Sequence, residues 1–419
     1  MRVPCKQPYG ETSVKKLTRR ATLGALAATP LAAPALVRAA SVSKTVKIGL
    51  ICDMNGPYRT VGGPGSKIAT ELAIQDFGGT VLGRKIEILQ ADDQNKPNIA
   101  SALARQWIAE DHVDVLGDGS ATSSGLGVQQ VSHEKNVIYL CTGPAATDFT
   151  DKLCSPVGFH FGYDTYALAK STGGTLTKQG GKTWFFITAD YEFGYSLRDN
   201  TEKFIKAAGG KVLGNVNAPL GTADFSSYLI RAKASGAQVI GFANAGTDLQ
   251  NCLKQSTEFG ITKGGQKLAT LLMSIEDVIS VGQKNAAGLV LTNSFYWNMS
   301  PAAAAWGKRF WSRIDQPPAQ QHAGLYSAVF HWLKAVKAAG TTEGPAVAKK
   351  MHAMKVNDFY MKDVSIEPNG RVLNNMYLWQ VKPPSAGQKK WDFYKLLATT
   401  PGKDAFQPLA ETGCPLVHA

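Results

Sequence analysis

Short apolar runs alternate with amphipathic helix patterns along most of this chain, and that alternation restricts the fold more than any other feature. Runs typical of buried strands occur in a first series at residues 46–51, 86–89, 113–116 and 137–141. A second series occurs at residues 184–188, 211–216, 238–243, 268–273 and 289–293. Helix patterns stand between most of these runs. Strands joined through helices pair in parallel, so the sequence predicts an α/β protein with two lobes, each a parallel sheet flanked by helices.

The N-terminal segment has the pattern of an export signal. Basic residues precede an apolar run at residues 21–37, which closes on Ala39 and Ala40. This order is typical of a secretory signal peptide, so we expect residues 1–40 to be removed. Residues 18–23 resemble a twin-arginine signal, although Thr22 stands where that motif usually has an aromatic or large apolar residue, and the general export route stays open. No Leu-x-x-Cys lipobox follows, which favours a free periplasmic protein over a lipoprotein.

Charge and motifs exclude several classes of function. The formal net charge of +13 falls to +7 without the first 40 residues, and no basic cluster is interleaved with aromatic residues, so we expect no nucleic-acid partner. The Gly-rich stretch at residues 62–65 lacks the spacing of a dinucleotide loop and contains Pro64. No metal-ligand spacing occurs, so we expect neither metal nor cofactor. An α/β hydrolase or oxidoreductase would need an activated nucleophile or a cofactor loop, and the sequence shows neither.

Five cysteines remain once the N-terminal segment is set aside. Cys154 and Cys414 lie in Pro-containing, loop-like surroundings, which makes them the expected disulfide pair in an oxidising compartment. Cys52, Cys141 and Cys252 lie inside strand or helix patterns and are predicted to be buried small apolar residues.

Residues 113–128 combine a strand, a tight loop and a helix that resumes near Leu126. The first amides of such a helix have no backbone partner, and the helix dipole is positive there, so the loop suits a small anion. Gly119 allows close approach of the backbone. Hydroxyls could add to those amides at Ser120, Thr122, Ser123 and Ser124. One hypothesis is therefore a carboxylate or phosphate held by hydrogen bonds without being transformed, and the alternative is that these hydroxyls only cap a helix.

The order of several loop motifs resembles one known family. The motifs are D-M-N-G-P-Y from Asp53, G-D-G-S-A-T-S-S-G from Gly117, G-P-A-A-T-D-F-T from Gly143, A-D-Y-E-F-G from Ala189 and N-A-G-T-D from Asn244. Together they are similar to the periplasmic binding proteins of branched-chain amino-acid ABC transporters. The resemblance covers nearly all of residues 44–400.

This resemblance implies a type I periplasmic binding fold, in which two Rossmann-like lobes are joined by a three-stranded hinge and close on a small ligand. Lobe 1 would comprise residues 44–161 and about 297–357, and lobe 2 would comprise residues 162–296 and about 358–385. Residues 386–419 would form a C-terminal tail. The ligand would pass to ABC permease subunits in the inner membrane, and we expect a periplasmic monomer without a cofactor.

Site residues carry over from the family by position. The ligand carboxylate would meet hydroxyls and amides of lobe 1 at Ser120, Thr122, Ser123, Ala146 and Thr147. Lobe 2 would close on the ligand with Tyr163, Tyr191, Asn244 and Ala245. An acid, Glu276 or Asp277, would hold the ligand ammonium.

Three departures bear on the ligand. Asn95 and Ser120 stand roughly where the amino-acid binders have a disulfide. Val61 stands where those binders place an aromatic residue, and Tyr58, three residues earlier, is the aromatic side chain of this loop expected to contact the ligand. The segment around Asn244 lacks their tyrosines. The expected ligand is a branched-chain amino acid. The alternatives are an aromatic carboxylate or a small amide, or a ligand-sensing regulatory role in the same fold.

Overall fold

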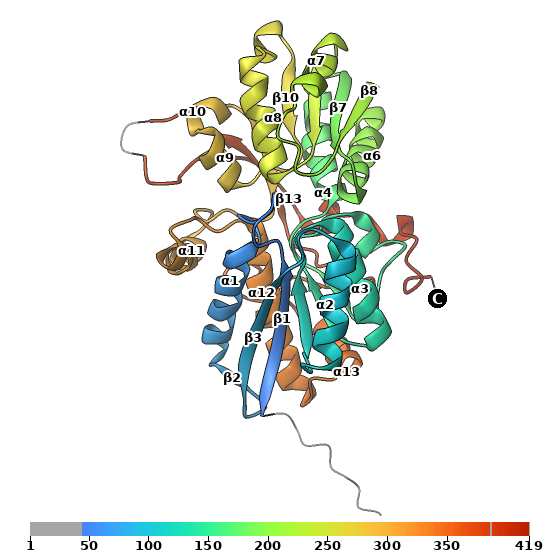
Figure 1. Ribbon diagram of the computed structural model, residues 1–419, viewed down its shortest axis with the longest axis vertical. Coiled ribbons are helices and arrows are strands. Elements are labelled where there is room, and N and C mark those ends of the chain that lie inside the picture. Colours follow the sequence, from blue (N-terminus) through green and yellow to red (C-terminus); the bar gives the residue numbers. More distant parts are fainter. Residues whose placement is uncertain (1–43, 386–387, 419) are drawn as a thin grey trace, which may run out of the picture. The chain divides into compact units, whose positions relative to one another are not determined.

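Two parallel sheets and a small antiparallel sheet form the framework of the computed structural model, which describes residues 44–385 and 388–418 (Figure 1). The first sheet has the strand order β2-β3-β1-β4-β5-β6, and all its neighbours are parallel except β2 with β3. The second has the order β10-β9-β7-β8 and is entirely parallel. The predicted α/β class with helix-flanked parallel sheets is confirmed.

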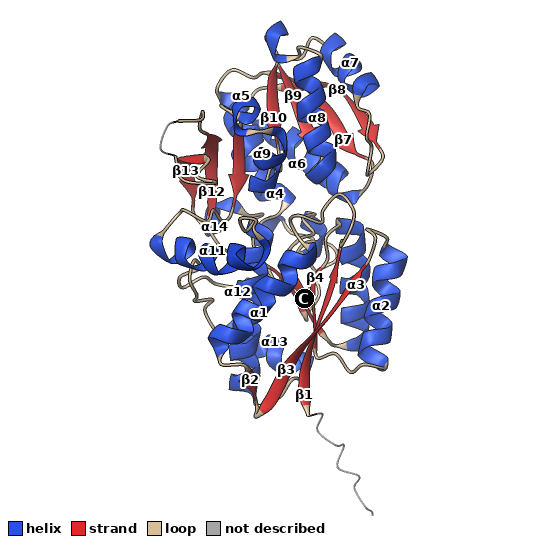
Figure 2. Ribbon diagram, turned by 60° about the vertical axis from the view of Figure 1, so that its left-hand side comes forward, coloured by secondary structure: helices blue, strands red, loops and turns tan. Residues whose placement is uncertain are grey.

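The first lobe is built on the six-stranded sheet. Its strands are β1 (Thr45–Cys52), β2 (Thr80–Val81), β3 (Arg84–Asp92), β4 (Val115–Asp118), β5 (Ile138–Cys141) and β6 (Gly158–His160). Its helices are α1 (Gly63–Phe77), α2 (Pro97–Ala109), α3 (Thr122–Lys135), α11 (Pro301–Ile314), α12 (Gln320–Ala339) and α13 (Gly344–Ala353). Helices α2 and α3 pack together on one side of the sheet, and α1, α12 and α13 lie on the other (Figures 1 and 2). Because both faces are covered, β4 and β5 are buried at every residue.

The second lobe is built on the four-stranded sheet. Its strands are β7 (Thr183–Ala189), β8 (Lys211–Ala218), β9 (Val239–Ala243) and β10 (Lys267–Thr270). Its helices are α4 (Thr165–Leu168), α5 (Gly174–Lys178), α6 (Glu192–Ala207), α7 (Ser226–Ala234), α8 (Gly246–Glu258), α9 (Ile275–Val281) and α10 (Gln283–Ala286). Short 3-10 turns lie at Thr147–Phe149, Thr262–Gly264 and Leu409–Glu411, and a π-helical turn lies at Ala169–Gly173.

Three stretches of chain connect the lobes. The first follows β6 and the second follows β11 (Val290–Asn293). The third runs into β12 (Met376–Val381) and lies against the first, since the His160 amide donates to the Gly370 carbonyl at 3.0 Å. Strand β12 pairs antiparallel with β11 on one side and with β13 (Tyr394–Thr400) on the other. The hinge is therefore braced by a sheet of its own.

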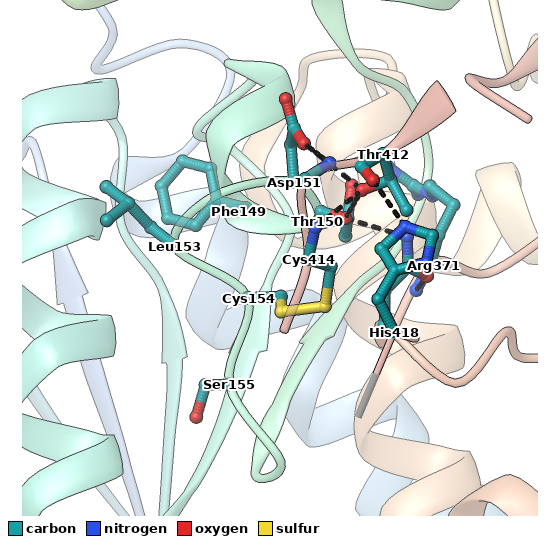
Figure 3. The surroundings of a disulfide bond; sticks show 12 residues. Phe149, Thr150, Asp151, Leu153, Cys154, Ser155, Arg371, Thr412, Cys414 and His418 are labelled. Atoms are coloured by element: carbon teal, nitrogen blue, oxygen red, sulfur yellow. Dashed lines mark hydrogen bonds between the residues drawn. A yellow bond between two sulfur atoms is a disulfide. The ribbon is translucent and has the colours of Figure 1, made fainter. Parts of the chain in front are cut away.

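The segment expected to be a C-terminal tail contains β13 and the short helix α14 (Gly402–Ala405). Residues 401–418, the C-terminal strap, then run beside both lobes. Cys414 forms a disulfide with Cys154, the pair expected from the sequence, and the Thr412 hydroxyl donates to the Thr150 carbonyl at 3.1 Å (Figure 3). On the side of the second lobe, Lys203 Nζ of α6 lies 2.9 Å from Glu411 Oε2.

The loop after β4 differs from the sequence interpretation. Helix α3 begins at Thr122, four residues before Leu126, and its N-cap is Ala121, which has no side-chain hydroxyl to cap the helix. The alternative that the hydroxyls of this loop only cap α3 is therefore wrong. Small residues near its start let α3 approach its neighbours closely, since a Cβ at Gly125 would lie 2.4 Å from a ring carbon of Pro144.

Candidate functional site

A narrow cavity lies where the loops that follow strands of both parallel sheets meet. Ligands of such sheets collect beyond the carboxyl ends of the strands. The first lobe lines the cavity with Tyr58, Val61, Gly62, Asp118, Ser120, Thr122, Gly143 and Gln321. The connecting segment and the second lobe contribute Tyr163, Tyr191, Phe193, Ala245 and Leu272.

A buried carboxylate shapes the loop that carries Tyr58. Asp53, at the end of β1, is fully buried and accepts hydrogen bonds from the amides of Asn55 at 3.1 Å and Tyr58 at 2.8 Å. The same carboxylate accepts from Asn95 Nδ2 at 2.7 Å and from the Gly56 amide. An aspartate that gathers nearby backbone amides fixes a turn, so Asp53 holds Tyr58 at the mouth of the cavity.

The two lobes touch through polar contacts beside the cavity. The hydroxyls of Tyr58 and Tyr191 are 2.6 Å apart, and burial raises the pKa of both phenols. The Thr247 amide at the start of α8 donates to the Pro57 carbonyl at 3.3 Å. A Cβ at Gly246, whose φ is +59°, would lie 2.3 Å from that carbonyl oxygen, so this approach needs glycine.

Hydrogen-bond donors gather at helix N-termini around the cavity. Thr122 is the first residue of α3, Tyr191 is the N-cap of α6, and Ala245 is the N-cap of α8. Thr122 Oγ1 accepts from the Ala145 amide at 3.2 Å and Ser120 Oγ accepts from the Asp53 amide at 2.8 Å. Each of these hydroxyls can still donate its own hydrogen. Together with the positive ends of three helices, they suit a carboxylate.

Two polar side chains of the cavity wall were not singled out from the sequence. Asp118 ends β4 with φ of +71° and is almost fully buried, and burial raises its pKa to about 6. Gln321 lies in the first turn of α12, and its Nε2 donates to the Tyr163 hydroxyl at 3.0 Å. Asp118 could have been found from its place between the strand and the hydroxyl loop. Gln321 could not have been found from the sequence, because it lies in the pattern of a helix far along the chain from the hydroxyl loop, and nothing in that pattern points to this cavity.

The residues expected at the site divide into two groups. Those that line the cavity are Tyr58, Ser120, Thr122, Tyr163, Tyr191 and Ala245. Those outside its lining are Ser123, Ala146, Thr147, Asn244, Glu276 and Asp277. Asn244 is buried and its Nδ2 lies 3.2 Å from Cys252 Sγ. Ala146 is the buried N-cap of the turn that Thr147 begins.

Neither acid expected to hold an ammonium group faces the ligand cavity. Asp277 closes a capping box at the start of α9, where its Oδ2 accepts from the Ser274 amide at 2.7 Å and its Oδ1 accepts from Gln250 Nε2 at 2.8 Å. Glu276 is buried, and burial raises its pKa well above the usual range; neither of its carboxyl oxygens has a hydrogen-bond partner among the described residues. Leu272 lines the cavity on this side. The ammonium role of these acids therefore gains no support from the cavity lining.

The part of the chain that the structure describes holds no group of three or more His, Cys, Asp or Glu side chains suited to a metal ion. None of its helices is both long enough and apolar enough to span a bilayer.

The family model described as periplasmic binding protein matches residues 45–389. The chain belongs to the periplasmic binding protein family. A crystal structure of a periplasmic binding protein from Burkholderia mallei is 46% identical, superposes with a TM-score of 0.87, and is matched over 89% of this chain and 99% of its own.

Two further comparisons fall in the branched-chain amino-acid group of the family. The structure of a branched chain amino acid ABC transporter periplasmic ligand-binding protein from Burkholderia xenovorans is 34% identical with a TM-score of 0.79, over 89% of this chain and 100% of that one. The Leu/Ile/Val-binding protein homolog 6 of Brucella melitensis is 25% identical over 86% of this chain and 94% of its own length.

Membership of the periplasmic binding protein family indicates the class of activity and the cellular compartment. Periplasmic binding proteins of this type are substrate-binding components of transporters, not enzymes, so the hydrolase and oxidoreductase readings are set aside. The family implies a periplasmic location. The predicted signal peptide, residues 1–40, lies outside the described residues.

Proposed function

We propose that this periplasmic binding protein captures a small carboxylate-bearing ligand between its lobes and delivers it to the permease of an ABC importer in the inner membrane. The observation that carries the proposal is the cavity between the strand ends of both sheets, where the hydroxyls of Ser120 and Thr122 meet the N-termini of three helices. Export would follow from the signal peptide at residues 1–40, by the twin-arginine or the general route, and the mature protein would be a monomer.

Capture would work by closure. Hydroxyls and helix ends hold the carboxylate, and the side chains of Val61, Phe193 and Leu272 form an apolar wall for the rest of the ligand. Excluding water strengthens each polar contact, because the same charges attract more strongly at a lower effective dielectric. The contact of Tyr58 with Tyr191 joins the lobes beside the cavity and contributes to the closed state. A ligand favours closure only as far as it binds that state better than the open one.

An amino acid of the branched-chain type is the first ligand candidate, supported by the apolar wall and by the relatives named above. An aromatic carboxylate is the second candidate, and a specific observation favours it: four aromatic rings, those of Tyr58, Tyr163, Tyr191 and Phe193, line the cavity. Small amides belong to the same range of ligands. A sensing role would use the same capture step with a regulatory partner in place of the permease.

A thermal-shift screen of the purified protein tests the proposal. A ligand at about 100 times its dissociation constant contributes ~2.7 kcal/mol to the free energy of unfolding, so leucine, isoleucine, valine or benzoate should raise the midpoint measurably if it is bound.

A matched pair of variants ties such a shift to this cavity. Thr122→Val removes a cavity hydroxyl at nearly constant volume and should weaken the bound ligand about 5- to 10-fold. Thr147→Val removes a hydroxyl outside the lining and should leave the dissociation constant unchanged. If no small carboxylate shifts the midpoint, or if both variants bind like the wild type, the proposal fails.

A further inference from the structure

We propose that Asp118 and Gln321 form the acceptor side of the cavity, and that they select ligands which carry a hydrogen-bond donor, either a protonated amine or a hydroxyl, in addition to a carboxylate. This inference rests on the proposed function, because it assigns specificity within the same cavity. It also places the acid that meets the ligand on the first lobe, away from Glu276 and Asp277.

The orientation of the Gln321 amide follows from its neighbours. The Tyr163 hydroxyl donates its only hydrogen to the Gly143 carbonyl at 2.8 Å, and a carbonyl can only accept. The same hydroxyl can therefore only accept from Gln321, at 3.0 Å, so the nitrogen of the amide faces Tyr163. Gln321 Oε1 is left buried and has no hydrogen-bond partner among the described residues.

An unpartnered buried acceptor is costly. Leaving such a group unsatisfied costs roughly 1–3 kcal/mol, whereas a donor placed against it recovers that loss. Gln321 lines the cavity, so a donor on the ligand is the group that can reach its oxygen. This preference for a donor is independent of any property of Asp118.

The Asp118 carboxylate is open toward the cavity because two glycines stand beside it. A Cβ at Gly62 would lie 3.3 Å from Asp118 Oδ2, and a Cβ at Gly143 would lie 3.2 Å from Oδ1. Both glycines line the cavity. The Ser66 hydroxyl donates to Oδ2, and the Thr142 hydroxyl lies 3.5 Å from Oδ1. A carboxylate accepts about four hydrogen bonds, so lone pairs remain for a ligand.

None of the described residues that line the cavity is Lys, Arg or His, so no positive side chain there offsets this carboxylate. The titratable neighbours of Asp118 carry no positive charge: they are the thiols of Cys52 and Cys141, the Asp93 carboxyl and the hydroxyls of Tyr139 and Tyr163. A buried charge is stable only when it is paired. A protonated amine on the ligand would supply the missing cation, and a ligand hydroxyl would supply a weaker, neutral donor.

Isothermal titration calorimetry with two ligand pairs tests this assignment. Leucine and 4-methylpentanoate differ only in the amine, and 4-hydroxybenzoate and benzoate differ only in the hydroxyl. In the pair that the wild type binds, we expect the donor-bearing member to bind about tenfold tighter or more. The pair that shows the preference tells whether the donor is an amine or a hydroxyl.

Variants then locate the preference. Asp118→Asn keeps the shape of the side chain but removes its charge, and should reduce the preference to about threefold or less. Asp277→Asn is the matched control and should leave the preference unchanged. Gln321→Ala should lower it less than Asp118→Asn does.

The outcomes separate this inference from the proposed function. Equal affinity within the pair that binds, or a preference that survives Asp118→Asn, overturns the role of Asp118 while carboxylate capture stands. If none of the four probes binds and no other small carboxylate shifts the midpoint in the thermal-shift screen, both proposals fail. If Asp118→Asn does not fold, two other measurements test the inference. They are the affinities of the wild type for the two members of a ligand pair, and the same affinities in Gln321→Ala.

Discussion

Removing the disulfide between Cys154 and Cys414 should destabilise the protein by several kcal/mol. The bridge joins residues 260 positions apart. In the chain-entropy description, closing a loop of that length lowers the entropy of the unfolded chain by an amount worth about 5–6 kcal/mol at 25 °C, and removal of natural bridges typically costs ~2–5 kcal/mol. An unfolding entropy of about 2.1 cal/mol/K per residue gives ~0.8 kcal/mol/K for a chain of about 375 residues, so a loss of ~4 kcal/mol lowers the melting midpoint by about 5 °C.

The perturbation is the double variant Cys154→Ser with Cys414→Ser, followed by differential scanning calorimetry with and without reductant. Reductant should lower the midpoint of the wild type toward that of the double variant and leave the variant unchanged, because Cys52, Cys141 and Cys252 are free and buried. Thiol titration of the denatured mature protein should find two more thiols after reduction. Equal thiol counts with and without reductant, or a midpoint shift below about 1 °C, would refute the reasoning.

Two further predictions concern the site and the response to pH. Tyr58→Phe or Tyr191→Phe removes the 2.6 Å hydrogen bond between the lobes and should weaken ligand binding about fivefold, as expected for the loss of ~1 kcal/mol. If titration calorimetry finds unchanged affinity in both variants, this hydrogen bond has no role in closure. Asp248 lies buried in the first turn of α8, and burial raises its pKa to about 7. Between about pH 4 and pH 7 the folded protein therefore binds more protons than the unfolded chain, and the free energy of unfolding falls as pH rises. Asp248→Asn should make this decrease in the free energy of unfolding smaller by up to ~4 kcal/mol. Urea titrations at pH 4.5 and pH 8 measure the decrease, and an equal decrease in the variant and the wild type would argue against the raised pKa of Asp248.

The alternation of apolar runs with helix patterns was sufficient to predict the two helix-flanked parallel sheets. The runs that became β5 and β9 are uninterrupted apolar segments, and those that became β1, β4 and β7 are mostly apolar, because both faces of their sheets are covered by helices. The strand β13 was missed, since its exposed residues, such as Leu396 and Leu397, carry no alternation with a buried face. The start of α3 was placed too late because its first turn is made of Thr and Ser, which favour loops when read alone.

The candidate site was only half accessible to sequence reasoning. Loops that follow strands brought Tyr58, Ser120, Thr122 and Tyr191 to the cavity, as expected for parallel sheets. Within a loop, however, the direction of each side chain depends on tertiary contacts. Asp277, for example, forms a capping box with Ser274 at the start of α9. The sequence shows only two adjacent acids, Glu276 and Asp277, and does not tell which way either side chain points.

The C-terminal strap is attached to the two lobes by bonds of very different strength. Cys414 is held to the first lobe covalently, whereas the Lys203–Glu411 pair on the second lobe is a surface ion pair with side chains 55% and 48% exposed. Exposed ion pairs contribute little and are screened by salt. The start of the strap is held differently, because Ala405 and Phe406 are buried in one apolar cluster with Phe193 and Leu197 of α6. Any separation of the lobes would therefore have to bend the strap between Phe406 and Cys414, and salt would weaken only the Lys203–Glu411 contact that lies between them.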